Sequence, residues 1–358
     1  MLVGGECMSK VIATAALPGE YRYETPEIVD YLKRSWFVAV DPRTARKAVT
    51  ILKGSNIDSR CSVLPIEQIF SDLSFEEKND LYIEAMKKMG EKVLLLALAK
   101  ADLKPTDIDY IITTSCTGFM IPSVDAYLVN QLKMRGDIER LPVTEMGCAG
   151  GTSGLIYAHQ YLKGNPGKRV ALVSVETPTI TFQKGDHSME NFVSAATFAD
   201  GASCVILGDT PQVAPTIIDT SMYHFPDNTH LMGYHLTNSG LKIVLDKDVP
   251  FEIQSHFPGI IEPFFKRNGL SFQDVAHYIF HPGGKKISHM VEEYLTTYDR
   301  NILDSKAILR EYGNMSSATV IFVLNRMLQQ QEFQAGAKGY MLAFGPGFTA
   351  QSILLEWR

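Results

Sequence analysis

Cysteine is scarce in this sequence, and its arrangement excludes two kinds of site. The 358 residues include five cysteines, an odd number, and no two of them form a CxxC pair. Disulfide frameworks and structural zinc centres need paired or clustered cysteines, so we expect neither, and we expect no metal. A reducing cytoplasm is the simplest compartment. The cysteines are Cys7, Cys61, Cys116, Cys148 and Cys204.

Long apolar runs and an excess of basic residues are also missing. No stretch approaches the roughly 20 apolar residues of a membrane span, and the first residues lack the basic and apolar segments of a signal peptide. The net charge is −6 and no aromatic-plus-basic sheet motif is present, so nucleic acid is not an expected partner. The length allows two domains or one large duplicated unit.

The hydrophobic pattern predicts a layered α/β protein. Strands are expected at 11–15, 110–115, 169–176, 203–207, 277–281 and 339–345, and helices at 31–53 and 75–100. Strands in the second half follow the same order as those in the first, which indicates two similar halves. The composition changes over 208–215, and we place the boundary there, between halves 1–210 and 211–358.

The glycine-rich stretch 147–154 contains the first candidate for chemistry. Its small residues allow a tight turn, and the apolar spacing after it predicts a helix. Cys148 would then lie at or just inside a helix N-terminus, where free N–H groups and the helix dipole stabilise a thiolate. A buried structural cysteine is the alternative.

Two polar residues in the second half could complete a site with Cys148. His281 ends an apolar strand, where a hydrogen-bonded core histidine is the ordinary interpretation. Asn314 precedes an apolar helix, where a helix cap is the ordinary interpretation. Together with Cys148 they suit one reaction: His281 would hold the sulfur as an ion pair, and His281 and Asn314 would donate to an enolate oxygen after decarboxylation of a malonyl thioester. A cysteine protease uses the same residue types, but no protease signature surrounds Cys148.

A basic cluster lies on the first predicted helix and just after it. It is either a solvated helix face or a docking site for a phosphorylated carrier. Its members are Lys33, Arg34, Arg43, Arg46, Lys47, Lys53 and Arg60.

Six motifs resemble those of type III polyketide synthases of the chalcone synthase-like group, in this order along nearly the whole chain. The resemblance implies a thiolase-like fold, with two similar βαβαβαββ halves in α/β/α/β/α layers. It also implies a homodimer that uses acyl-CoA and malonyl-CoA and needs no further cofactor. The motifs are TSCTGFMIPS at 114–123, MGCAGG at 146–151, FADG at 198–201, HPGG at 281–284, GNMSSA at 313–318 and FGPGF at 344–348.

The resemblance also assigns roles. Cys148 carries the starter and the growing chain, and His281 and Asn314 bind the thioester carbonyl. Phe198 is a gatekeeper, and Ile243 stands where relatives usually have a second aromatic, which leaves the gate half aromatic. The expected pocket residues are Cys116, Thr117, Ile121 (reaching across the dimer), Glu176, Thr181, Ser316, Gly345 and Pro346, and the expected coenzyme A contacts are Arg46, Lys47, Lys53 and Gly283.

Within this group, the CTGFM loop and the stretch SFEEKN at 74–79 resemble bacterial members. Such members often take fatty acyl starters, so we expect a medium- or long-chain starter, malonyl-CoA extension and an alkylpyrone or alkylresorcinol product. One alternative is a single-round ketoacyl synthase III-like enzyme with an acyl carrier protein, although the HPGG and GNMSS motifs differ from that family. A non-catalytic thiolase-fold scaffold is another.

Overall fold

The computed structural model describes residues 9–358. Cys7 and most of the N-terminal segment, in which we expected no signal peptide, lie outside this range. One nine-stranded sheet runs through the molecule in the order β11-β12-β13-β8-β1-β7-β6-β4-β5. Its two parts meet where Lys10 of β1 pairs with Thr216 of β8. The strands are β1 (Lys10–Pro18), β4 (Tyr110–Thr114), β5 (Glu139–Val143), β6 (Val170–Glu176), β7 (Gly201–Gly208), β8 (Pro215–His224), β11 (His277–Phe280), β12 (Lys338–Gly345) and β13 (Thr349–Trp357).

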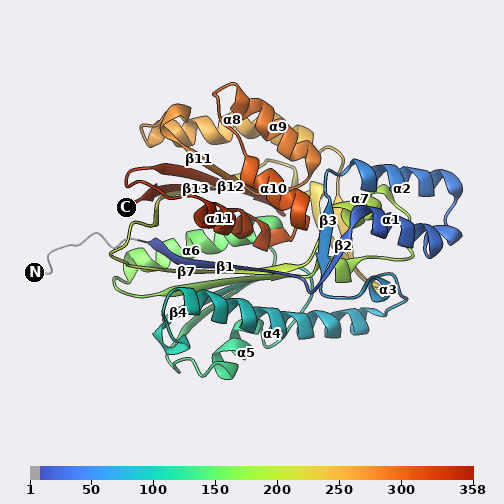
Figure 1. The fold of residues 1–358 in the computed structure, drawn as a ribbon, viewed down its shortest axis with the longest axis horizontal. Coiled ribbons are helices and arrows are strands. Elements are labelled where there is room, and N and C mark those ends of the chain that lie inside the picture. The colour runs from blue at the N-terminus through green and yellow to red at the C-terminus, as the bar shows by residue number, and fades with distance from the viewer. Residues whose placement is uncertain (1–8) are drawn as a thin grey trace, which may run out of the picture.

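Helices separate and cover the two parts of the sheet (Figure 1). In Figure 1, α8 (Val249–Arg267) and α9 (Lys285–Thr296) lie over the strands of the second half, and α4 (Phe75–Lys100) and α5 (Val124–Gln131) lie over those of the first. Between the parts lie α6 (Gly150–Gly164) and α11 (Thr319–Gln330), with α10 (Leu303–Tyr312) beside them. The predicted α/β/α/β/α layering is confirmed.

The two halves share a strand order. β4 is parallel to β6, which is followed by antiparallel β7 and β1; β11 is parallel to β12, which is followed by antiparallel β13 and β8. The first half adds β5 beyond β4, whereas the second half has no corresponding strand within residues 9–358. The repeat predicted from the sequence is therefore present, but the second half contributes one strand fewer to the sheet than the first half.

Burial explains why these strands read as continuous apolar runs. Every residue of β6 is buried, because helices cover both of its faces. The central helix α11 is buried from Thr319 to Asn325. The longest helix, α4, starts at a capping box in which Ser74 accepts from the Glu77 N–H, while the Glu77 carboxylate accepts from Ser74 N–H. No helix within residues 9–358 is both long and apolar enough to span a bilayer.

The helix predicted for 31–53 is wrong as a single element. The structure has α1 (Thr25–Arg34) and α2 (Pro42–Gly54), separated by a 3-10 turn at Phe37–Ala39. Asp41 caps α2 by accepting from the N–H groups of Arg43 and Thr44, and Pro42 occupies the first helical position. Trp36 is buried against Phe70, Phe182 and Phe192, and this packing holds the chain in a bend.

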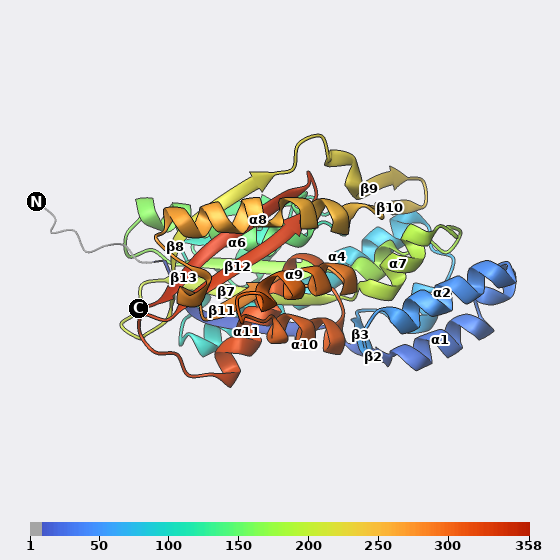
Figure 2. The ribbon, with the colours of Figure 1, turned by 90° about the horizontal axis from the view of Figure 1, so that it is seen from above.

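Five small elements complete the fold. The strands β2 (Tyr21–Glu24) and β3 (Ser59–Ser62) pair beside α1 and α2, and α3 (Ile66–Ile69) follows them. The hairpin of β9 (Met232–Thr237) and β10 (Gly240–Leu245) lies beside α7 (Met189–Thr197), as Figure 2 shows. These elements and α7 surround the ends of the strands where the candidate site lies.

Candidate active site

Cys148 lies in a 3-10 turn, Gly147–Ala149, that leads directly into α6. Gly147 has φ +47°, and a Cβ there would lie 2.5 Å from Pro346 Cδ. A Cβ at Gly345 would lie 2.6 Å from that of Ala149. Only glycine fits both places, so the loop after β12 packs against the turn that presents the thiol. Gly345 and Pro346, which we expected in the pocket, are thus placed behind Cys148.

The N-terminal ends of α6 and α11 approach each other at the site. A Cβ at Gly151 would lie 2.3 Å from the carbonyl oxygen of Ser317, so only glycine permits this contact. The Thr114 hydroxyl at the end of β4 lies within hydrogen-bonding distance of Ser317 Oγ, at 3.1 Å, and of Ser174 Oγ, at 2.8 Å. These contacts join residues from both halves of the chain around Cys148.

The carboxamide of Asn314 is held in one orientation. Its Oδ1 accepts from the Ser316 N–H at 2.8 Å and from the Thr319 hydroxyl at 3.3 Å. Nδ2 therefore faces the other way, 3.2 Å from the Gly283 carbonyl oxygen and 4.0 Å from Cys148 Sγ. Asn314 thus presents N–H groups to the thiol and caps no helix, since Ala318 is the N-cap of α11.

His281 follows β11 and is 3% exposed. Its backbone N–H donates to the Leu342 carbonyl at 2.8 Å, while both ring nitrogens lack hydrogen-bond partners among the described residues. Burial lowers the pKa of His281 to about 3, and burial raises the pKa of the Cys148 thiol to about 12. In the unliganded site, burial acts against both charged forms and thus against the predicted thiolate–imidazolium pair, whereas the start of α6 acts in its favour. The ion pair stays a prediction.

A buried carboxyl group organises the other side of the thiol. Glu176, at the end of β6, accepts from Ser317 Oγ at 2.6 Å, from the Cys116 N–H at 3.1 Å and from Thr117 Oγ at 3.1 Å. Burial raises the pKa of this carboxyl group. Burial also raises the pKa of the Cys116 thiol, with the Glu176 charge acting in the same direction. Cys116 is therefore a neutral wall residue.

Ser316 connects this wall to the amide. Its φ is +47°, a left-handed conformation that costs a non-glycine residue about 1 kcal/mol or more. Its Oγ lies 3.6 Å from Cys116 Sγ. Its hydrogen bond to Cys148 acts against burial on the pKa of that thiol. This strained residue touches both sulfur atoms of the site and also holds Asn314.

Phe198 is joined to Asn314 through the backbone. Asn314 N–H donates to the Thr197 carbonyl, and Ala199 N–H donates to the Asn314 carbonyl, both at 2.9 Å. The residue predicted to be the gatekeeper is thus held beside the residue predicted to bind the thioester carbonyl.

The hairpin supplies a residue that sequence reasoning missed, Tyr234. It lies directly opposite Ile243 in the β9–β10 pairing. Burial raises the pKa of Tyr234 well above its usual value, and the charges of Cys116 and Glu176 act in the same direction, which places its hydroxyl beside the site. The same hydroxyl bonds to Thr181. An alternating stretch that ends in Asn-Ser-Gly is a hairpin signal, and it could have located this residue.

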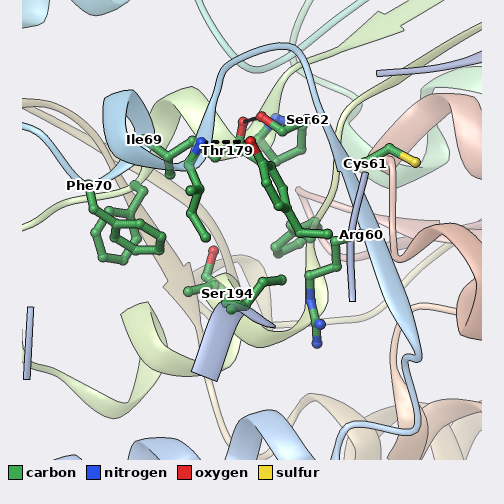
Figure 3. A pocket seen from close by; sticks show the side chains of 14 residues that line it. Arg60, Cys61, Ser62, Ile69, Phe70, Thr179 and Ser194 are labelled. Carbon is green, nitrogen blue, oxygen red and sulfur yellow. Dashed lines mark hydrogen bonds between the residues drawn. The ribbon is translucent and has the colours of Figure 1, made fainter. Parts of the chain in front are cut away.

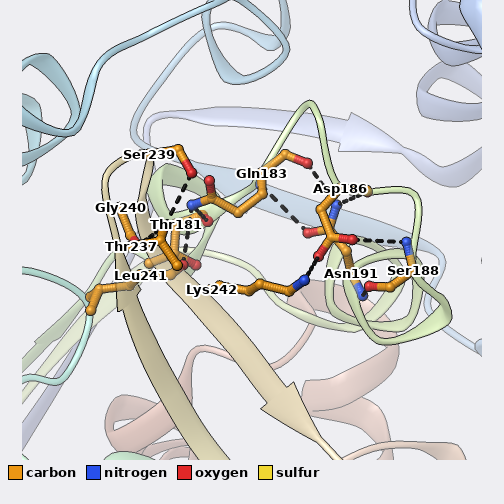
Figure 4. Close-up of polar contacts among 10 residues, drawn as sticks. All are labelled: Thr181, Gln183, Asp186, Ser188, Asn191, Thr237, Ser239, Gly240, Leu241 and Lys242. Atoms are coloured by element: carbon orange, nitrogen blue, oxygen red, sulfur yellow. Dashed lines mark hydrogen bonds and ion pairs between the residues drawn. The ribbon is translucent and has the colours of Figure 1, made fainter.

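Side-chain contacts attach the hairpin to the segment before α7 (Figure 4). Gln183 Nε2 donates to the Leu241 carbonyl at 3.2 Å, and Lys242 Nζ lies 3.2 Å from Asp186 Oδ2. Lys78 of α4 donates to the carbonyls of Phe182 and Ser239. The strands that carry Tyr234 and Ile243 are therefore fixed relative to Phe198.

The remaining predicted residues lie at the surface. Arg46, Lys47 and Lys53 are exposed on α2. Lys285 Nζ donates to the Gly54 carbonyl at 3.1 Å, which brings the end of α2 to the start of α9, two residues after Gly283. Ile121 is 97% exposed on the loop after β4. The exposed cations Arg46, Lys47 and Lys53 thus form a basic rim, apart from the buried residues around Cys148.

Comparison with known proteins gives a consistent family. The N-terminal domain of chalcone and stilbene synthases matches residues 62–211, and the C-terminal domain matches residues 217–357. A 1,3,6,8-tetrahydroxynaphthalene synthase of Streptomyces peucetius is 34% identical over 96% of this chain and 91% of its own length. A phloroglucinol synthase of Pseudomonas fluorescens is 31% identical over 94% and 96%. The crystal structure of the tetrahydroxynaphthalene synthase of Streptomyces coelicolor, a bacterial type III polyketide synthase, superposes with a TM-score of 0.91 at 27% identity, covering 98% of this chain and 99% of its own.

Proposed function

The chain belongs to the chalcone and stilbene synthase family and is a type III polyketide synthase, and we propose that Cys148 accepts a medium- or long-chain fatty acyl group from coenzyme A. Malonyl-CoA then extends this group in repeated decarboxylative Claisen condensations, and an alkylpyrone or alkylresorcinol is released. The thioesters supply the activated carbon, so the reaction uses no other cofactor.

The fixed orientation of Asn314 is the observation that supports this chemistry. Decarboxylation leaves negative charge on a thioester oxygen, and the Asn314 N–H groups, 4.0 Å from Cys148 Sγ, are positioned to donate to that oxygen. Glu176 is held by three donors, and burial raises its pKa.

His281 supplies the base when the starter is loaded. As Cys148 Sγ attacks the thioester carbonyl, its proton passes to a free ring nitrogen of His281. Coenzyme A leaves with a proton, and the acyl group remains on the sulfur. In extension, malonyl-CoA loses carbon dioxide, and the carbanion attacks the acyl carbonyl carbon and breaks its bond to the sulfur.

The small side chains of Cys116 and Ile243 support an alkyl starter, because they leave room that an aromatic residue would fill. A second candidate is a small starter and a hydroxylated aromatic product. The relatives are named for tetrahydroxynaphthalene and phloroglucinol, compounds without an alkyl chain. The polar side chains of Thr117, Glu176 and Tyr234 around the chamber favour this candidate.

A starter panel tests both candidates. Wild-type enzyme is incubated with malonyl-CoA alone, and with acyl-CoA starters from acetyl to palmitoyl, and the products are identified by mass spectrometry. Products that contain the acyl chain plus two or more extensions support the fatty starter. Equal turnover without any acyl-CoA supports the small starter, and a single extension that requires acyl carrier protein would contradict both.

Two surface features support further parts of the proposal. The exposed cations Arg46, Lys47 and Lys53 on α2 suit the coenzyme A phosphates, and Gly283 lies where the carrier arm would pass Asn314. A fully exposed isoleucine is costly in water, so we propose that Ile121 packs against a second copy of this chain in a homodimer. Sedimentation of the purified protein tests the dimer.

A further inference from the structure

A second cavity lies against Phe198, on elements that the chemistry described above does not use (Figure 3). It has a volume of about 50 Å³. Its walls come from α1, β3, α3, the 3-10 turn Pro178–Thr181 and α7. The apolar side chains that line this Phe198 cavity are Ile28, Ile66, Ile69, Phe70, Phe182 and Phe198.

The cavity shares two walls with the catalytic chamber. Phe198 lines the cavity, and its backbone pairs with that of Asn314. The turn Pro178–Thr181 starts at the cavity with Pro178 and ends with Thr181, which bonds to the Tyr234 hydroxyl beside the thiols. Phe198 and the turn Pro178–Thr181 therefore link the wall of the cavity to the residues around Cys148.

Several polar groups in the wall are hydrogen-bonded within the protein, among them Tyr23 Oη, which accepts from the Ile66 N–H, whereas the Ser194 hydroxyl faces the cavity (Figure 3). The hydroxyls of Ser62 and Thr179 bond to each other at 3.1 Å, and Thr179 also donates to the Asp200 carboxylate. Figure 3 shows the Arg60 guanidinium pointing away from this pair. Arg60 donates to the carbonyl oxygen of Ala196, to Thr25 Oγ and to Ser55 Oγ.

The Cys61 thiol is neutral, because burial raises its pKa to about 11. A polar ligand would find few free partners here, whereas a hydrocarbon would gain burial against isoleucine and phenylalanine side chains.

We propose that the Phe198 cavity holds the tail of the acyl starter while its thioester is on Cys148. This inference rests on the proposed fatty acyl starter and adds the place where the alkyl chain goes. The polar chamber then keeps its hydrogen-bonding groups for the keto oxygens of the growing chain, and the tail lies among apolar side chains.

The volume sets the length of tail that fits. One water-sized group needs roughly 10–15 Å³ of such space, so the 50 Å³ cavity accepts roughly four methylene-sized groups. Burial of each methylene changes affinity by about fourfold. Changes in the size of the cavity should therefore shift the preferred starter length in steps of that order.

The test changes the cavity in both directions in the full-length enzyme. Ala195→Leu and, independently, Ser194→Leu add atoms to the α7 wall, and Ile69→Ala removes atoms from the α3 wall. The rate constant kcat/KM is measured with saturated acyl-CoA starters of 4 to 16 carbons. We expect either leucine variant to lower kcat/KM at least about tenfold for the longest accepted starters and to leave butyryl-CoA within about twofold. Ile69→Ala should move the optimum up by one or two carbons.

The matched control is Ala126→Leu, the same change at a partly buried alanine on α5 that lines neither space. It should leave the length profile as in wild type. An unchanged profile in folded Ala195→Leu or Ser194→Leu enzyme would overturn the cavity proposal even if long starters are used. If wild-type enzyme extends no fatty starter, the proposed starter itself fails, and that result is visible before any variant is made.

Discussion

Ile243 lies directly opposite Tyr234 in the β9–β10 hairpin, so the two side chains share one face of the ribbon. The sequence predicted that the gate is half aromatic because position 243 lacks a ring. The neighbouring strand supplies one instead, and it brings a hydroxyl to the site with it. If Ile243 is part of a gate with Phe198, as the sequence predicts, Tyr234 on the neighbouring strand adds a phenol to that gate.

Adding a ring at position 243 should narrow this passage. Ile243→Phe would place two aromatic side chains opposite each other, and we expect kcat/KM for long-chain starters to fall about tenfold relative to short ones, because overpacking costs roughly 1–3 kcal/mol. The starter panel measures the ratio. Val244→Phe puts the same ring on the other face of the ribbon, and an equal effect of this variant would contradict the role of Ile243.

Removing the amide should affect decarboxylation more than loading. In Asn314→Ala, the rate of carbon dioxide release from malonyl-CoA is expected to fall by roughly two to three orders of magnitude. Acyl transfer to Cys148, followed by intact-protein mass spectrometry, should fall by less than about tenfold. Asn325→Ala removes another buried amide, on α11, whose Oδ1 accepts from the hydroxyl of Thr14 on β1. This variant should lower stability without changing the ratio of the two rates. Equal losses in both steps for Asn314→Ala would show that our role for it is wrong.

The buried thiol should react slowly at neutral pH. Because burial raises the pKa of Cys148 to about 12, the thiolate fraction is small at pH 7. We expect iodoacetamide alkylation to accelerate about tenfold per pH unit between pH 7 and pH 10. A pH-independent rate below pH 7 would instead reveal a thiolate–imidazolium pair. Cys148→Ala should lose the modification and all acyl loading, whereas Cys204→Ala, a buried change on β7, should retain both.

Acid should destabilise the fold through His281. Its pKa is about 3 in the folded chain against an ordinary value of 6.5, so below pH 6.5 the unfolded chain binds a proton that the folded chain excludes. Stability is therefore full above pH 6.5 and is lost as the pH falls toward 3. At pH 5 the loss from this group is about 2 kcal/mol. In urea unfolding of His281→Gln, the free energy of unfolding should fall by about 2 kcal/mol less than in wild type when the pH is lowered to 5. His289→Gln, which changes an exposed histidine on α9, should show the pH dependence of wild type.

The basic rim should act on binding and not on chemistry. For the double variant Arg46→Glu and Lys47→Glu, we expect KM for acyl-CoA to rise about tenfold with kcat nearly unchanged, and the difference should shrink at high salt. Steady-state kinetics at two ionic strengths measure this. Lys92→Glu with Lys163→Glu makes the same change in net charge at exposed positions on α4 and α6, and a similar rise in KM there would rule out a local contact.

Short-range pattern sufficed for the elements that carry the site. Six motifs marked the turn of Cys148, the strand ends before Cys116 and His281, and the loop of Asn314, because glycine turns and apolar runs are local features of the chain. The helix predicted for 31–53 was wrong, because the burial of Trp36 against other elements outweighs helical propensity there.

The residue types alone determined that a thiol, an imidazole and a carboxamide are available, and their spacing determined that each ends or begins a regular element. Only the tertiary structure decided that the Asn314 carboxamide lies beside the sulfur of Cys148 and that burial shifts the pKa values of Cys148 and His281. Those properties depend on neighbours more than a hundred residues away and on exclusion of water. No local pattern of the sequence encodes the identity of distant neighbours or the exclusion of water.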